Sequence, residues 1–424
     1  MIKDKQFALD VLLTSFGQII VVLIIFVQNK WLSIALESQG YLEYYLINQT
    51  GCVISFFTLF GLGIAIPRYI ARTRAVNDFA MEASYFFSAI IILIVTICIG
   101  GALLICMRNY LNNFVFEGRN ETLLTFVLSV GICLSNFIYS YYRGTGNFIF
   151  SNAAQIIIGI TCVCYLLFVN NVELAVIGIS VIQIFFSGAL IACLLVKYIR
   201  AKCSELSIKD RLLELLSYCL PRVPGEIFLF SYNIIPVALI NNLYGSEVGI
   251  KYVIALGIVA AASPLFKFVG MVLLPYASKI ITNGEKENLF KNVNWLLKAS
   301  LIFTIISVAI INIAPKFIIL VLYSPMYYSA SDVVRIVSFC IIPHSVYLIL
   351  RNPLDGLSKK PYNTIGIFIS LIALCFMLFV SKYFKNTEII VPLCFVVGNV
   401  LLGVVCYVFW KIEIRKTSLN IKYN

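Results

Sequence analysis

Runs of about 20 apolar residues, repeated along most of the chain, constrain this sequence more than any other feature. Each run is bounded by charged residues or by Gly, Asn or Pro. A run of this length forms a helix long enough to cross the hydrocarbon core of a bilayer. The predicted spans cover residues 8–28, 42–66, 80–107, 122–142, 148–169, 172–197, 223–243, 250–275, 293–314, 331–350, 362–381 and 388–410.

The composition points to the same class of protein. Of the 424 residues, 61% are hydrophobic and only 12% are charged, and the mean hydropathy is +0.96. A soluble domain is about half apolar and about a quarter charged. The sequence therefore predicts an all-α, polytopic integral membrane protein with about 12 transmembrane helices. No small-residue cleavage motif follows the first run, so we expect it to be a retained span and not a signal peptide.

The basic residues predict an orientation in the membrane. With the N-terminus inside, 22 of the 32 lysines and arginines fall in inner segments, seven fall in outer segments, and the other three lie within spans. Positive charge concentrates on the cytoplasmic side of membrane proteins. We therefore expect a multi-pass protein of the cytoplasmic (inner) membrane with both termini in the cytoplasm. The same bias accounts for the net charge of +12 without a nucleic-acid partner.

The longest inner connection divides the predicted spans into six plus six. It separates an N-terminal half (1–200) from a C-terminal half (223–424) through a connecting segment (201–222). A shift of 208 residues places Pro67 on Pro275 and Arg143 on Arg351, each pair at the end of a corresponding span. Two six-helix bundles around a central cavity suit alternating access, in which one half rocks against the other.

Several chemistries find no support in the residues. The cysteines lie mostly inside apolar runs, where they act as small hydrophobic residues. No Walker A motif is present, and no loop is large enough for a catalytic domain, so neither a cofactor nor a metal is predicted. The single histidine, His344, lies inside the tenth span. It is either a helix-packing residue or a proton-coupling group.

Ionisable side chains inside spans are costly and are therefore candidates for function. Lys267 lies about eight residues from Pro275 at the inner end of its span, so snorkelling to the interface only partly relieves its burial. We expect Lys267 to face a cavity. Shallower charges have two open explanations, snorkelling or function: Asp10, Glu43, Glu82, Glu226, Lys298 and Arg335. Tyrosines at the span ends predict an interfacial aromatic belt.

Four arginines lie at the inner ends of spans: Arg68, Arg143, Arg222 and Arg351. Topology alone explains arginines in such positions. Under the two-half arrangement, however, they would line an inner mouth, and the planar guanidinium binds two phosphate oxygens at once. These arginines and Lys267 are the candidate substrate-binding residues. Asp10 and Glu226 would either hold the arginines or carry a coupling proton.

Three segments resemble a known family. They are residues 61–71 (GLGIAIPRYIA), 221–226 (PRVPGE) and 351–359 (RNPLDGLSK). Each resembles the corresponding segment of Wzx-type polysaccharide-biosynthesis flippases, which belong to the multidrug/oligosaccharidyl-lipid/polysaccharide exporter superfamily. The resemblance extends over essentially the whole chain in length and span pattern. Within these segments, Arg68 and Arg222 match the family motifs.

The resemblance implies a flippase that moves an undecaprenyl-pyrophosphate-linked oligosaccharide repeat unit from the inner to the outer leaflet, for O-antigen or capsule synthesis. It implies membrane lipids, a polysaccharide polymerase and a chain-length regulator as partners. The membrane potential, a proton or a sodium ion would drive transport. The alternatives are a multidrug-type ion-coupled exporter of the same superfamily, a membrane-embedded polysaccharide polymerase or glycosyltransferase, and a non-transporting scaffold. A cation exporter should have an acidic cavity, and a polymerase should have a large outer loop.

Overall fold

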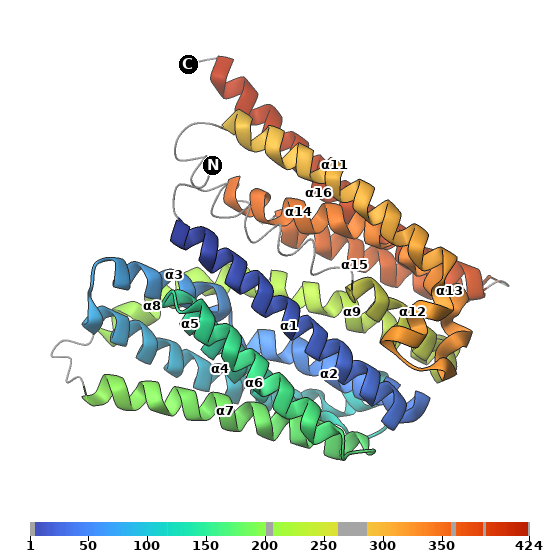
Figure 1. The fold of residues 1–424 in the computed structure, drawn as a ribbon, viewed down its shortest axis with the longest axis horizontal. Coiled ribbons are helices and arrows are strands. Elements are labelled where there is room, and N and C mark those ends of the chain that lie inside the picture. Colours follow the sequence, from blue (N-terminus) through green and yellow to red (C-terminus); the bar gives the residue numbers. More distant parts are fainter. Residues whose placement is uncertain are drawn as a thin grey trace. The chain divides into compact units, whose positions relative to one another are not determined.

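The computed structural model describes residues 5–116, 118–200, 207–261, 286–357, 362–384 and 387–422. All of the regular structure in these ranges is helical (Figure 1). The predicted all-α, polytopic fold class is confirmed. The chain divides by contacts into two compact units, Met1–Ile234 and Ile235–Asn424.

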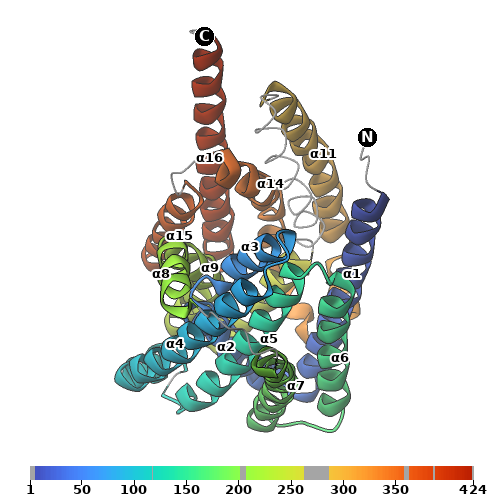
Figure 2. The same cartoon turned by 90° about the vertical axis from the view of Figure 1, so that its left-hand side faces the viewer.

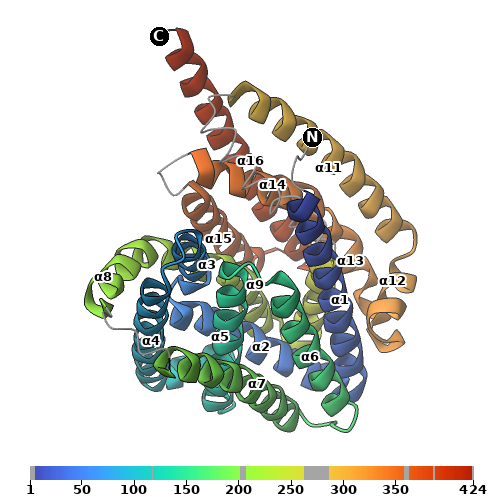
Figure 3. The ribbon, with the colours of Figure 1, turned by 60° about the vertical axis from the view of Figure 1, so that its left-hand side comes forward.

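The first unit contains the predicted spans one to six. They correspond to α1 (Lys5–Ala35), α2 (Glu37–Leu59) with α3 (Leu62–Ala75), α4 (Phe79–Phe114), α5 (Thr122–Gly144), α6 (Phe148–Leu166) and α7 (Val172–Arg200). The helix α8 (Ile208–Cys219) and the short 3-10 helix η1 (Leu220–Arg222) occupy the predicted connecting segment. Helix α8 packs on α3 and α4 of this unit (Figure 3).

The second predicted span is broken. The helical axes of α2 and α3 differ by 43°, because Phe60 (φ 51°) and Gly61 (φ 75°) both adopt the left-handed conformation. A left-handed residue commonly ends a helix, and glycine takes that conformation without steric cost. The Phe60 amide caps α2 by donating to the carbonyl groups of Phe56 and Phe57. The break sets the direction of α3, which carries Arg68.

The second unit contains the predicted spans eight to twelve. It holds a helix over residues 246–261, then α11 (Lys286–Ile313), α12 (Pro315–Leu322), η2 (Pro325–Ala330), α13 (Ser331–Ser338), α14 (Ile341–Leu357), α15 (Tyr362–Ser381) and α16 (Thr387–Lys422). Helix α9 (Val223–Tyr244), the predicted seventh span, runs across the division between the units. The eighth predicted span, 250–275, extends beyond the described residues after position 261.

Within the described ranges, nine helices are long and apolar enough to cross a membrane, and two bent helix pairs bring the total to as many as 11. The protein is therefore a multi-pass membrane protein. Its predicted orientation stays a prediction, since hydropathy and length do not report the side on which a helix ends.

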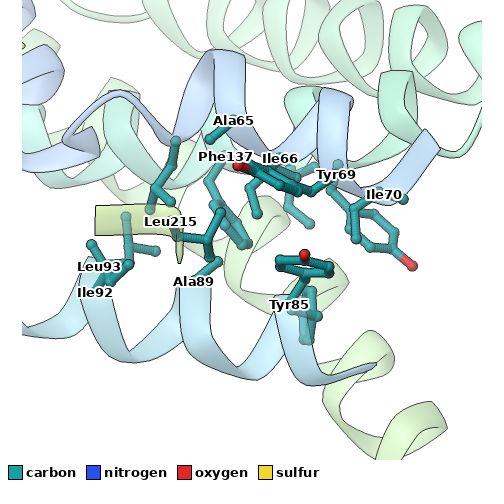
Figure 4. Close-up of a cluster of buried hydrophobic side chains, with 14 of the residues drawn as sticks. Ala65, Ile66, Tyr69, Ile70, Tyr85, Ala89, Ile92, Leu93, Phe137 and Leu215 are labelled. Carbon is teal, nitrogen blue, oxygen red and sulfur yellow. The ribbon is translucent and has the colours of Figure 1, made fainter. Parts of the chain in front are cut away.

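A hydrophobic core holds one end of the first unit together. It joins α3, α4, α5, α7 and α8 through residues that include Ile66, Phe86, Phe137 and Leu215, each fully buried. Figure 4 shows the side chains of α3 facing those of α4, with Leu215 of α8 at the edge of the cluster. This core fixes α3 and α5, and with them Arg68 in the middle of α3 and Arg143 near the end of α5.

Candidate functional site

Arg68 and Arg143 lie where α3 and α5 approach most closely. A Cβ atom at Gly144 would be 2.9 Å from the Cα atom of Pro67, so only glycine allows this contact. Arg68 follows Pro67, and Arg143 precedes Gly144. The structure thus brings these two predicted arginines to one end of the first unit, although 75 positions separate them in the sequence.

Both arginines are accessible to solvent. The guanidinium carbon of Arg68 lies 4.9 Å from the centre of the Tyr218 ring, and Tyr218 belongs to α8. Arg143 donates a hydrogen bond from Nη2 to the hydroxyl of Ser140, one turn earlier, at 2.9 Å. Within the described part of the chain, neither guanidinium has a carboxylate partner. Each guanidinium can therefore bind an anion without first breaking an ion pair.

The carboxylate of Glu82, by contrast, accepts hydrogen bonds from three side chains. The Arg74 guanidinium donates from Nε and Nη2 to Oε1 at 3.2 and 3.0 Å, and Nε also lies 3.1 Å from Oε2. The hydroxyl of Tyr198 donates to Oε1 at 2.7 Å, and that of Tyr141 donates at 3.2 Å. Only 4% of this side chain is exposed, and a polar group buried to this extent is stabilised by such hydrogen bonds.

This cluster of Arg74, Glu82, Tyr141 and Tyr198 joins α3, α4, α5 and α7. Arg74 also donates from Nη1 to the carbonyl oxygen of Thr145 at 3.1 Å, beyond the end of α5. We call these four side chains the Glu82 clamp. The clamp holds four helices in register. Oε1 of Glu82 receives all the donors except one contact from Nε of Arg74, so Glu82 has little capacity left for a ligand.

A second polar contact fixes α8 to α4. The Tyr85 hydroxyl donates to Oε2 of Glu214 at 2.6 Å, and Nη1 of Arg211 donates to the same oxygen at 3.0 Å. Burial acts to raise the pKa of Glu214, but the hydrogen bonds from Tyr85 and Arg211 outweigh it, so the pKa lies below its usual value. The Tyr69 ring stacks on Tyr85 at 4.8 Å and meets Tyr218 edge-on (Figure 4 shows Tyr69 and Tyr85).

The other predicted site residues are placed only in part. Arg222 lies in η1, Glu226 lies in α9 and Asp10 lies in α1, but their side chains are outside the described set. Lys267 lies wholly outside the described residues. Arg351 and His344 both belong to α14 in the second unit and are half-buried. The ring of His344 lies 5.9 Å from that of Tyr347.

Three of the shallow charges are paired with opposite charges. Glu82 is buried in its clamp, and Glu43 forms an ion pair with Arg119. Arg335 bonds Asp332 one turn earlier at 3.2 Å. Tyr141, which belongs to the tyrosines expected at the interface, is instead buried against Glu82. One sequence signal could have suggested the clamp: Arg74 and Glu82 are opposite charges flanking a short turn between two spans.

Among the described side chains, no three His, Cys, Asp or Glu residues come close enough together to hold a metal ion. What the first unit presents is therefore a pair of accessible arginines beside a saturated carboxylate clamp. This arrangement suits the binding of an anion and not general acid–base chemistry at Glu82.

No family model and no curated protein matches this sequence. Solved structures do. A multidrug resistance MATE family transporter of the MOP superfamily in an inward-facing conformation aligns with a TM-score of 0.75 at 14% identity, over 94% of this chain and 95% of its own. The fold is that of the MATE transporters. An outward-facing MATE family transporter gives a TM-score of 0.69 at 15% identity, over 96% of both chains.

A third solved structure is a MOP superfamily transporter from Pyrococcus furiosus, with a TM-score of 0.70, 16% identity and coverage of 96% of this chain and 95% of that one. It is described as having a binding pocket of reverse polarity that suggests a different function. These matches show the fold alone. They do not single out the Wzx-type flippases, because identities of 14–16% carry no information on cargo.

Proposed function

We propose that this protein is a membrane transporter that works by alternating access. The observation that carries the proposal is the full-length match to transporters of the MATE fold in both inward-facing and outward-facing conformations. The division of the chain into two compact units fits a mechanism in which two bundles move against each other.

The charges favour an anionic cargo. At the end of the first unit that carries Arg68 and Arg143, the carboxylates of Glu82 and Glu214 each pair with an arginine, whereas Arg68 and Arg143 have no such partner among the described residues. A binding site for a cation would need the opposite imbalance. Together with the sequence resemblance, this imbalance supports the finer proposal that the cargo is an undecaprenyl-pyrophosphate-linked oligosaccharide, with the two guanidinium groups binding the pyrophosphate.

The second candidate is a multidrug-type ion-coupled exporter. The names of the solved relatives favour it, because two of them are described as multidrug resistance transporters. The two candidates differ in the sign of the cargo's charge and in whether the cargo carries a lipid tail. They therefore predict different phenotypes for the same substitutions.

The deciding measurement is the sidedness of lipid-linked oligosaccharide in cells depleted of the protein. Under the flippase proposal, the repeat units accumulate on the inner leaflet, and cells carrying Arg68→Ala or Arg143→Ala reproduce this at normal protein abundance. Arg68→Lys is expected to retain part of the transport, because lysine keeps the charge but cannot form the bidentate contact with a phosphate. Arg108→Ala is the matched control, since Arg108 lies near the other end of α4 and bonds Asn120.

Normal sidedness in depleted cells, combined with greater sensitivity to cationic drugs, would reject the flippase in favour of the multidrug exporter. If the units reach the outer leaflet but stay unpolymerised, the protein acts in assembly and both transport proposals are wrong. The partners implied by the resemblance, a polymerase and a chain-length regulator, belong to the flippase proposal alone.

A further inference from the structure

A cavity of about 600 Å³ lies within the second unit, between α11, α14 and α16. Helix α14 packs against both of the others and lies between them in Figure 2, so it forms the floor while α11 and α16 form the walls. On the floor, a Cβ atom at Gly403 would lie 2.9 Å from the carbonyl oxygen of Pro343. Glycine at this position lets α14 and α16 meet at backbone distance.

The walls are mostly apolar, and each of them carries one lysine. Helix α16 contributes Val400, Val404, Tyr407 and Lys411, which share one face of the helix because they recur every three to four residues. Helix α11 contributes Leu301, Leu297 and Lys298 in the same way. We call this cavity the lysine groove. It is open to its surroundings, since Val404 is 52% exposed.

Both lysines line the groove, one from each wall. Phe290, near the start of α11, packs on Trp410, near the end of α16, with ring centres 5.4 Å apart. Lys411 directly follows Trp410, whereas Lys298 lies eight residues beyond Phe290, about 12 Å along α11 at helical rise. The two lysines therefore line the groove at different levels.

Neither lysine is neutralised by the described part of the protein. Lys298 is exposed and has no carboxylate partner there, and Lys411 contacts only the Tyr407 ring, at 5.4 Å from its centre. Two cations that face one cavity favour an anion between them. The apolar walls that continue from them favour a hydrocarbon chain attached to that anion. The volume is within the range of small-molecule pockets.

We propose that the lysine groove binds one anionic phospholipid, with the phosphate between Lys298 and Lys411 and an acyl chain along Val404 and Leu301. Isolated snorkelling would explain each lysine alone. It does not explain why two lysines that lack a carboxylate partner among the described residues line one apolar cavity. The site belongs to the second unit alone and is independent of the cargo proposed above. A phospholipid there would stabilise the packing of α11 on α14.

The test uses the full-length protein, purified in neutral detergent and examined by native mass spectrometry with phosphatidylglycerol or phosphatidylcholine. The wild type is expected to retain phosphatidylglycerol preferentially. Lys298→Gln/Lys411→Gln, which removes both charges and keeps polar side chains, should bind it on the order of 30-fold more weakly, from about fivefold for each basic group at a lipid headgroup. The matched control is Lys316→Gln/Lys382→Gln, which removes the same charge at the opposite ends of the helices of this unit.

Two further experiments test whether the groove binds the acyl chain as well as the phosphate. Val404→Trp should displace phosphatidylglycerol although both lysines remain, and its exposed position accommodates the larger ring. Glycerol phosphate, the headgroup without chains, should not compete at equal concentration. Equal phosphatidylglycerol binding by the glutamine variant and the wild type would overturn the proposal, as would equal loss in the matched control. Undiminished binding by Val404→Trp, or full competition by glycerol phosphate, would show that only the phosphate is bound. Either result would overturn the proposal that the groove binds a phospholipid.

Discussion

Replacing Glu82 should destabilise the first unit more than any other single loss of charge among its described residues. The carboxylate receives hydrogen bonds from Arg74, Tyr141 and Tyr198, and only 4% of its side chain is exposed. Removing one partner of a buried, hydrogen-bonded pair costs about 3–5 kcal/mol. Arg74 is 39% exposed, however, and water can solvate it once the carboxylate is gone.

The expected cost of Glu82→Ala is therefore near the lower limit, about 3 kcal/mol. Glu82→Gln keeps an oxygen for the tyrosine hydroxyls but loses the charge-assisted contact with Arg74, so it should cost about 2 kcal/mol. For a unit of this size, 1 kcal/mol corresponds to roughly 2–4 °C in the unfolding midpoint. Glu82→Ala should then lower the midpoint by about 6–12 °C.

The assay is thermal unfolding of the purified protein in detergent, followed by a thiol-reactive dye. Glu173→Gln is the control, because Glu173 is an exposed carboxylate of α7. A double-mutant cycle with Arg74→Ala should give a coupling of about 1–2 kcal/mol, since the two residues are in direct contact. If Glu82→Gln leaves the midpoint within about 1 °C of the wild type, or if the cycle is additive, the clamp does not hold the helices as argued.

Further predictions concern two other contacts of the first unit. Gly144→Val should force α3 away from α5, because its Cβ atom would lie 2.9 Å from the Cα atom of Pro67, and it should cost about 1–3 kcal/mol, measured as a lowered unfolding midpoint. The docking of α8 should weaken in acid: the pKa of Glu214 is lowered in the folded protein, so its stabilising contacts with Tyr85 and Arg211 are complete above about pH 4.5 and are lost as the pH falls through that lowered pKa. The protection of the α8 amides, measured as exchange relative to the intrinsic rate at each pH, should therefore decrease below that pH, and Glu214→Gln should be less protected than the wild type at neutral pH and respond less to acid. A Glu214→Gln variant with unchanged exchange at neutral pH would contradict this account.

The sequence by itself determined the fold class and the positions of most spans. The predicted run 362–381 coincides with α15 (Tyr362–Ser381), and 122–142 falls within α5 (Thr122–Gly144). This succeeds because hydropathy is a property of neighbouring residues, and in lipid a helix must satisfy its backbone hydrogen bonds within its own segment. The break between α2 and α3 was missed, because apolar residues continue through Phe60 and Gly61.

Only the tertiary structure decided which charges are paired. In the sequence, Glu82 and Lys298 are equivalent: each is a single ionisable residue near the end of an apolar run. In the structure, Glu82 is enclosed by side chains from three other helices, whereas Lys298 lines an open groove. Tyr198 reaches Glu82 across 116 positions of sequence. The cost of a buried charge depends on such distant partners, which helix packing brings together and which a local pattern does not specify.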